Sequence, residues 1–139
     1  MPKIILTAFF ILTGILNSIS QEKHTITVYF EGMKSDKGNL YVAIYNNKKA
    51  FLKESIKGRI IKISDKKASL VFENMISGTY AISAFHDVND NKKMDTNFIG
   101  VPKEPIGISN DAKGFMGPPK YKDAKFDVIQ SIKMTIRIK

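Results

Sequence analysis

Short runs in which apolar and polar residues alternate recur along the chain from residue 25 onwards. In the first run Ile26, Val28 and Phe30 are separated by threonine and tyrosine. This period of two, built from β-branched and aromatic residues, is typical of a strand with one buried face. Similar runs follow, and together they predict seven strands at residues 25–31, 39–45, 55–63, 68–73, 81–86, 125–128 and 132–138.

Turn-forming residues separate the runs, and no stretch shows a helical period over a useful length. Gly38 ends a polar turn after the first run, so we expect the first two strands to pair as a hairpin. Gly78 precedes Tyr80 by two residues at the start of a strand, which predicts a tyrosine corner. Strands spaced by about ten residues predict an all-β fold. We expect a seven-stranded antiparallel Greek-key sandwich, immunoglobulin-like or prealbumin-like, with one long ordered loop.

The second predicted strand is apolar on both faces. Leu40, Val42 and Ile44 alternate with two tyrosines and an alanine. A strand that is buried on both sides lacks the polar face of an exposed strand. We therefore place this strand in the middle of a sheet.

Residues 1–20 differ from the rest of the chain. Lys3 precedes an apolar run at residues 4–16, and Ser18 and Ser20 place small residues before Gln21. This pattern predicts a cleaved secretory signal peptide at residues 1–20 and a single β-sandwich domain at residues 21–139, exported to the periplasm or secreted. The alternative is an uncleaved anchor, although about 13 apolar residues fall short of the ~20 that span a bilayer.

The chain is basic and contains no cysteine. It has 22 Lys and Arg against 13 Asp and Glu, a net charge of +9. Without Lys3 the balance is 21 − 13, or +8. The lysines are scattered rather than clustered, which favours a solvated cationic surface over nucleic-acid binding. Attraction to anionic cell-surface polymers is the alternative, and the lack of cysteine excludes disulfides and thiolate metal sites.

Oxygen-bearing side chains recur directly after the fifth predicted strand, in a segment that we call the acid–amide loop (residues 87–97). Ca²⁺ takes about six to eight oxygen ligands at about 2.4 Å. The spacing predicts a metal site formed by side chains and one backbone carbonyl, with the ligands Asp87, Asn89, Asn91, Lys93 (carbonyl) and Asp95. No other cofactor is predicted.

The acid–amide loop departs from the EF-hand pattern at two positions. Phe98 stands where an EF-hand has a bidentate glutamate, and Lys92 stands where it has a glycine. The Asn97 carbonyl or a residue of the following segment is then needed to complete the site. Two carboxylates predict weak affinity, about 10⁻⁴–10⁻³ M. The alternative is that the Asp and Asn side chains bond their own backbone in Asx-turns.

More than thirty residues separate the fifth and sixth predicted strands, and we call this stretch the flap segment (residues 87–120). It is rich in glycine and proline but also apolar, with Phe98, Ile99, Val101, Ile106, Ile108, Phe115 and Met116. Loops this long are uncommon in compact domains and are often functional. We expect an ordered flap that either caps the core or forms the wall of a pocket beside His86.

Further candidate site residues are His86, Glu104, Ser109 and Asn110. They allow a small hydrolase or sugar-processing domain centred on His86, with Glu104 or Asp95. Neighbouring residues on a strand point to opposite faces, so His86 and Asp87 do not pair automatically. No residue stands out as an activated nucleophile, and the sequence favours a protein without catalytic activity.

The flap segment carries a spaced pattern that resembles a known family. It reads His86-Asp87-x-Asn89-x-Asn91-x-x-x-Asp95-Thr96-Asn97-Phe98-x-Gly100-x-Pro102-x-Glu104, then Gly107-x-Ser109-Asn110 and Gly117-Pro118-Pro119. This resembles the family called domain of unknown function 2141, small exported bacterial proteins similar to prealbumin-like modules. The resemblance covers essentially the whole chain after residue 20, although relatives often have glycine where this chain has Lys92.

The resemblance implies a fold and export, and it implies no activity. Together with the residues, it predicts a non-catalytic binding or interaction module with an extracytoplasmic ligand or protein as its partner. It predicts no contact with nucleic acid and no transmembrane helix in the mature chain.

Overall fold

The computed structural model describes residues 21–139. The predicted signal peptide at residues 1–20 lies outside the described residues, so its cleavage and the export of the protein stay predictions. None of the helices from residue 21 onwards is long and apolar enough to cross a lipid bilayer.

The described chain is almost entirely β-structure, with eight strands rather than the predicted seven. Two short helical turns, η1 and α1, lie near the end of the chain. In chain order the elements are β1 (Lys23–Glu31), β2 (Asn39–Tyr45), β3 (Lys57–Lys62), β4 (Ala68–Ile76), β5 (Gly78–Asp87), β6 (Ile106–Ile108), η1 (Ser109–Asp111), α1 (Tyr121–Ala124), β7 (Phe126–Val128) and β8 (Ile132–Arg137). The additional strand is β6, within the segment that was predicted to be one loop.

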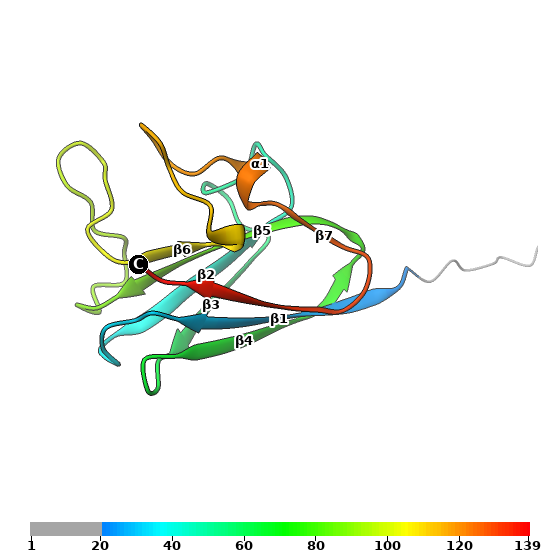
Figure 1. Cartoon of the computed structure of the whole chain (residues 1–139), viewed down its shortest axis with the longest axis horizontal. Helices are drawn as coiled ribbons and strands as arrows, with labels where there is room; N and C mark the ends of the chain where they lie inside the picture. Colours follow the sequence, from blue (N-terminus) through cyan, green and yellow to red (C-terminus); the bar gives the residue numbers. More distant parts are fainter. Residues whose placement is uncertain (1–20) are drawn as a thin grey trace, which may run out of the picture.

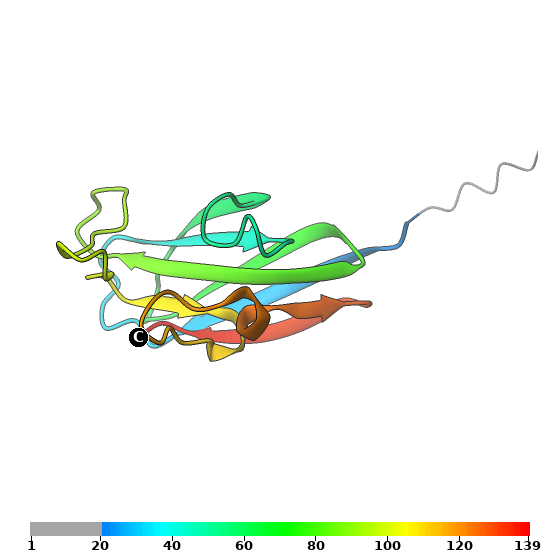
Figure 2. The same ribbon diagram turned by 90° about the horizontal axis from the view of Figure 1, so that it is seen from above.

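The strands form two sheets (Figure 1). One sheet has the order β4-β1-β8, and the other has the order β3-β2-β5-β6, with β7 pairing to β5 as well. The predicted central position of β2 is confirmed. The predicted hairpin of the first two strands is wrong, because β1 and β2 belong to different sheets. Figure 2 shows the longer strands running along the long axis of the domain.

The sheets are not purely antiparallel, which corrects a second prediction. β8 runs parallel to β1, with Ile26 opposite Ile132 and Phe30 opposite Ile136. The chain reaches β8 from β7, which pairs with the other sheet. A strand that arrives by such a crossover is free to run parallel to its neighbour, whereas a tight hairpin forces an antiparallel pair.

One core lies between the two sheets. From the three-stranded sheet Ile26, Val28 and Phe30 are at most 1% exposed, and Phe72 is fully buried beside them. The facing side chains alternate along β2 and β5 and include Leu40, Val42, Ile44, Ile82 and Ala84. The period of two seen in the sequence therefore marks the buried face of each of these strands.

The start and the end of β5 are both held by specific contacts. At the start, the Tyr80 hydroxyl donates a 2.6 Å hydrogen bond to the carbonyl of Ile76, which confirms the predicted bond of the tyrosine corner. At the end, Gly38 has a φ of +67°, and a Cβ on it would lie 1.7 Å from the carbonyl oxygen of Asp87. Only glycine fits there, so the β1–β2 connection packs closely on the root of the acid–amide loop.

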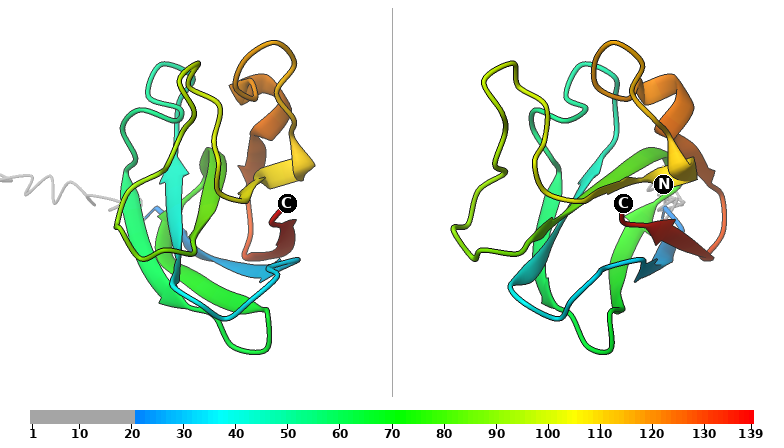
Figure 3. Two further views of the ribbon diagram at one scale, coloured as in Figure 1. Left: turned by 90° about the vertical axis from the view of Figure 1, so that its left-hand side faces the viewer. Right: turned by 60° about the vertical axis from the view of Figure 1, so that its left-hand side comes forward.

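The flap segment is not a lid over the sandwich. β6 divides it into two loops, and Ile108 in β6 is buried in the sheet. The apolar residues on either side were expected to be buried, but Phe98, Phe115 and Met116 are 98%, 88% and 95% exposed. Both loops rise from the same side of the domain as the connection between β2 and β3 (Figure 3). They therefore border the outer face of the five-stranded sheet instead of closing over it.

Candidate functional site

His86 lies inside the protein at the end of β5. It is 1% exposed, and its Nε2 lies 2.6 Å from the carbonyl oxygen of Lys37, to which it donates. Its Nδ1 is buried with no hydrogen-bond partner among residues 21–139. His86 therefore ties the acid–amide loop to the β1–β2 connection, and its imidazole does not face a ligand at the surface.

Asp87 holds the backbone of the acid–amide loop. Its side chain is fully buried, Oδ1 accepts the Asn91 N–H at 3.2 Å, and Oδ2 accepts the Lys92 N–H at 2.9 Å. These bonds span four and five residues. The Asx-turn bonds of the predicted alternative span two residues and are made by Asn89 and Asn91, whose Oδ1 atoms accept the Asn91 and Lys93 N–H groups at 3.3 and 3.2 Å. The turn also places Lys92 at a φ of +65°, the left-handed region that glycine adopts without strain.

The other ligands predicted for a metal converge on Asp95. The Nδ2 groups of Asn89 and Asn91 donate to the two oxygens of its carboxylate at 2.8 and 2.6 Å. These bonds, the Asn89 bond first, lower the pKa of Asp95 against a smaller opposing effect of burial, and the charge of Lys93 lowers it further. Lys93 donates its backbone N–H to the Asn91 Oδ1 at 3.2 Å.

The chain comes back to this cluster at Glu104, near the end of the first flap loop (residues 88–105). The Lys103 N–H donates to the Asp95 carbonyl at 2.8 Å, and Thr96 bridges to Pro102. Glu104 is 9% exposed, and its Oε2 accepts the Asp95 N–H at 3.4 Å. The sequence singled out Glu104 as a candidate but did not place it beside the acid–amide loop, because only the fold of residues 95–103 brings it there.

Ser109 and Asn110 lie in a different part of the fold. The Ser109 hydroxyl is fully buried, accepts the Ile82 N–H at 3.0 Å and donates to the Ala124 carbonyl at 2.5 Å. Asn110 donates to the carbonyls of Asp123 and Lys125 at 3.2 and 2.8 Å. Ser109 joins η1 to β5 and α1, Asn110 joins η1 to the α1 turn, and neither joins the cluster around Asp95.

The outer face of the five-stranded sheet carries a hollow of about 1130 Å³, which we call the outer hollow. On its floor the rings of Tyr41 and Phe85 stack with their centroids 4.9 Å apart. Ala43 pairs with Ser83 on neighbouring strands of the same floor, and these small side chains fill little of the space. The walls come from β3, β6 and both flap loops, and include Ile60, Met94, Ile99, Val101, Pro102, Ile106, Ile108, Pro118 and Pro119.

The outer hollow was not predicted as such, although β2 gave a signal. Its outward side chains Tyr41, Ala43 and Tyr45 are as apolar as its inward ones. Tyr45 packs in a second small cluster with Phe51 and Ile108, which covers part of this face. The remainder of the face lines the hollow, so the double-sided apolar pattern of a central strand marked a surface as well as a core.

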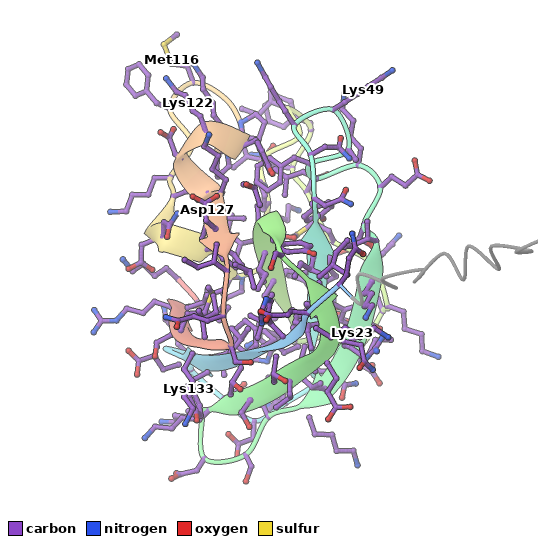
Figure 4. All side chains as sticks on the ribbon, turned by 90° about the vertical axis from the view of Figure 1, so that its right-hand side faces the viewer. Lys23, Lys49, Met116, Lys122, Asp127 and Lys133 are labelled. Atoms are coloured by element: carbon purple, nitrogen blue, oxygen red, sulfur yellow. The ribbon has the colours of Figure 1, made fainter. Side chains whose placement is uncertain are left out.

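The outer hollow has few charged groups. Among residues 21–139, Arg59 is the single charged residue of the lining, and none is a histidine or an acid. Arg59 pairs with the inward Val42, so its side chain starts from the opposite face of β3. Around one end of the domain, Lys49 and Lys122 project on the same side as Met116, while Lys133 lies at the opposite end (Figure 4). The lining of the hollow is thus almost entirely apolar.

These features define an all-β protein with two sheets and an apolar hollow on one of them. The family described as "Uncharacterized protein conserved in bacteria (DUF2141)" matches residues 28–137, and the chain belongs to this family. This confirms the resemblance seen in the flap segment. No curated protein matches the chain, and no solved structure matches it.

Proposed function

We propose that the protein is a non-catalytic binding module, and that the outer hollow takes a small molecule with an apolar body and an acidic end group. The observation that carries this proposal is the size and lining of the hollow, about 1130 Å³ with a stacked aromatic floor. Ligand sites are typically concave, largely apolar and about 300–1,000 Å³ in volume, with a few polar groups that orient the ligand.

The charge of the protein supports an acidic ligand. The chain as a whole carries a net charge of +9, which raises the local concentration of anions. An apolar body would lie on Tyr41 and Phe85, and the acidic group would stay at the mouth of the hollow, in the field of these charges.

The same surroundings favour binding over catalysis. The lining residues of the outer hollow include no acid and no histidine that could transfer a proton. His86 and Ser109 are buried and engaged with backbone groups. A hydrolase centred on His86, a binder of anionic polymers and export of the protein stay predictions. The prealbumin-like or Greek-key class of the sandwich is also still a prediction, and the hydrogen bond of Tyr80 supports it.

The test is a titration of the purified protein with 1-anilinonaphthalene-8-sulfonate, an apolar dye with an acidic group, followed by displacement with dodecanoate. We expect one saturable site and full displacement. Ala43→Trp fills the floor of the hollow and should weaken dye binding at least tenfold. Thr27→Trp is the matched control, because Thr27 is half-buried on the outer face of β1, the central strand of the other sheet. Unsaturable binding, or equal affinity in the Ala43→Trp and Thr27→Trp variants, would refute the proposal.

A further inference from the structure

Glu104 is a buried acid whose carboxyl group lacks a full set of partners. It is 9% exposed, and its Oε1 is buried with no hydrogen-bond partner within residues 21–139. Its Oε2 has one long bond, 3.4 Å from the Asp95 N–H. Asp87 contrasts with it, because each of its oxygens accepts a backbone N–H. A buried charged oxygen without a partner is costly, so a native structure usually supplies a proton or a cation for it.

Glu104 also lies against two further acids. Burial raises the pKa of Glu104, and the negative charges of Asp87 and Asp95 raise it further, against the lowering effect of the Asp95 N–H. Ionised carboxylates accept hydrogen bonds but cannot donate them, so Glu104 and Asp87 cannot satisfy each other while both are ionised. When both are ionised, the pair needs a positive charge between them.

No basic side chain of residues 21–139 forms an ion pair with Glu104 or Asp87, although the charge of Lys93 acts on Asp95. The one ion pair within the described residues joins Arg137 to Glu31, on the three-stranded sheet. Lys92, Lys93 and Lys103 flank the acids in sequence, but none of them forms an ion pair with an acid of the cluster. The acids are therefore left to an ion from solution.

We propose that a divalent cation of the Ca²⁺ type binds between the carboxylates of Asp87, Asp95 and Glu104. Glu104 supplies the carboxylate that the loop sequence lacks at Phe98, and it does so from the return strand of the first flap loop. The donors are all oxygens, which suits Ca²⁺ and disfavours Zn²⁺. A shallow hollow of about 450 Å³, lined in part by Asn89, Asp95 and Glu104, gives the ion a path from solvent.

Binding requires a rearrangement of exposed side chains. In the described conformation no three His, Asp or Glu side chains of residues 21–139 are grouped to hold a metal, and the amide nitrogens of Asn89 and Asn91 occupy the Asp95 carboxylate. Both asparagines are exposed, so a half-turn of each amide group would present oxygens in place of nitrogens. The Ca²⁺ ion then takes the place of the two amide N–H donors at the Asp95 carboxylate, and water completes its coordination shell.

Three carboxylates should bind more tightly than the two that the loop sequence offers alone. We expect a dissociation constant of about 10⁻⁵–10⁻⁴ M, between sensor sites and weak extracellular sites. Mg²⁺ should bind less tightly, because it demands a more regular shell and gives up its waters reluctantly. This inference does not depend on what occupies the outer hollow, whose lining includes neither Asp87 nor Glu104.

The experiment is a calorimetric titration of CaCl₂, and separately MgCl₂, into chelator-treated and dialysed protein, with thermal melts at each endpoint. The expected result is one Ca²⁺ per chain and a melting temperature that rises with Ca²⁺. Glu104→Gln should weaken Ca²⁺ binding at least tenfold, and its amide keeps the size and shape of the carboxyl group. Glu73→Gln, an exposed acid on β4, is the matched control and should bind as the wild type does.

A second variant keeps the test decisive if Glu104→Gln impairs folding. If Glu104→Gln lowers the melting temperature in chelator, Asp95→Asn at the half-buried end of the cluster takes its place in the comparison. No heat and no stabilisation at 5 mM Ca²⁺ would overturn the proposal. So would wild-type affinity in a folded Glu104→Gln variant. Dye binding in the outer hollow is measured in chelator, so its result and the Ca²⁺ result are obtained independently.

Discussion

Replacing Ser109 with alanine should destabilise the protein without affecting any ligand directly. The Ser109 hydroxyl joins three elements, because it lies in η1, accepts the Ile82 N–H of β5 and donates to the Ala124 carbonyl of α1. The side chain is fully buried, so water cannot enter to replace either bond. Ser109→Ala leaves one buried N–H and one buried C=O without their partner.

The size of the effect follows from these two groups. Each buried polar group that loses its partner costs about 1–3 kcal/mol, which gives a total of about 2–6 kcal/mol for the two groups. Unfolding entropy of about 2.1 cal/mol/K per residue gives roughly 0.25 kcal/mol/K over residues 21–139. The melting temperature should therefore fall by about 8–24 °C. This is a large part of the ~5–15 kcal/mol that stabilises a typical domain.

Differential scanning calorimetry and urea unfolding of the variant measure both quantities. Ser69→Ala is the control, since Ser69 is an exposed serine on β4 and should change stability by less than about 0.5 kcal/mol. A loss below 1 kcal/mol for Ser109→Ala would refute the reasoning. A hydrolytic activity that disappears in a variant of unchanged stability would instead indicate a catalytic role for Ser109.

Three further substitutions test other features of the fold. Tyr80→Phe removes the 2.6 Å bond to the Ile76 carbonyl and should cost about 0.5–1.5 kcal/mol by urea unfolding, whereas Tyr29→Phe on the exposed face of β1 should cost nothing measurable. Lys92→Gly relieves a left-handed φ of +65° and should stabilise the protein by up to about 1 kcal/mol, and a loss of stability would contradict this. In chelator, Glu104→Gln should remove the free-energy cost of ionising the buried Glu104 carboxyl group. The fold raises the pKa of Glu104, so the wild type loses stability as the pH rises above the ordinary value of 4.5, and the variant should not. Parallel pH profiles of the two proteins would show that Glu104 is not the group responsible.

The positions of the strands could be predicted from the sequence because each buries one face. Buried and more exposed residues alternate along β1 and along most of β2. The inward residues of this pattern are among the most buried in the domain. Pairing could not be predicted in the same way, since the alternation does not say which strand lies next to which. β8 is the clearest example, because its regular pattern fits a parallel and an antiparallel neighbour equally well.

The candidate site was predicted in location but not in full composition. The recurrence of Asp87, Asn89 and Asn91 is local, so the sequence indicated the acid–amide loop directly. Glu104 joins the loop only through the pairing of residues 95–103, and β6 was hidden because its three residues are too few to show a period. The apolar residues of the flap segment were expected to be buried, yet Phe98 and Met116 are exposed on loops that surround the outer hollow.

The parallel pairing of β8 with β1 joins the two ends of the described chain. Residues 26 and 132 are partners, so the β4-β1-β8 sheet lacks one edge until β8 has been synthesised. Contacts between such distant positions slow folding, because a long loop must close before any of them forms. A nascent chain therefore keeps this edge open until β8 is free to pair, and loss of β8 would leave β1 with an unpaired edge along residues 26–31.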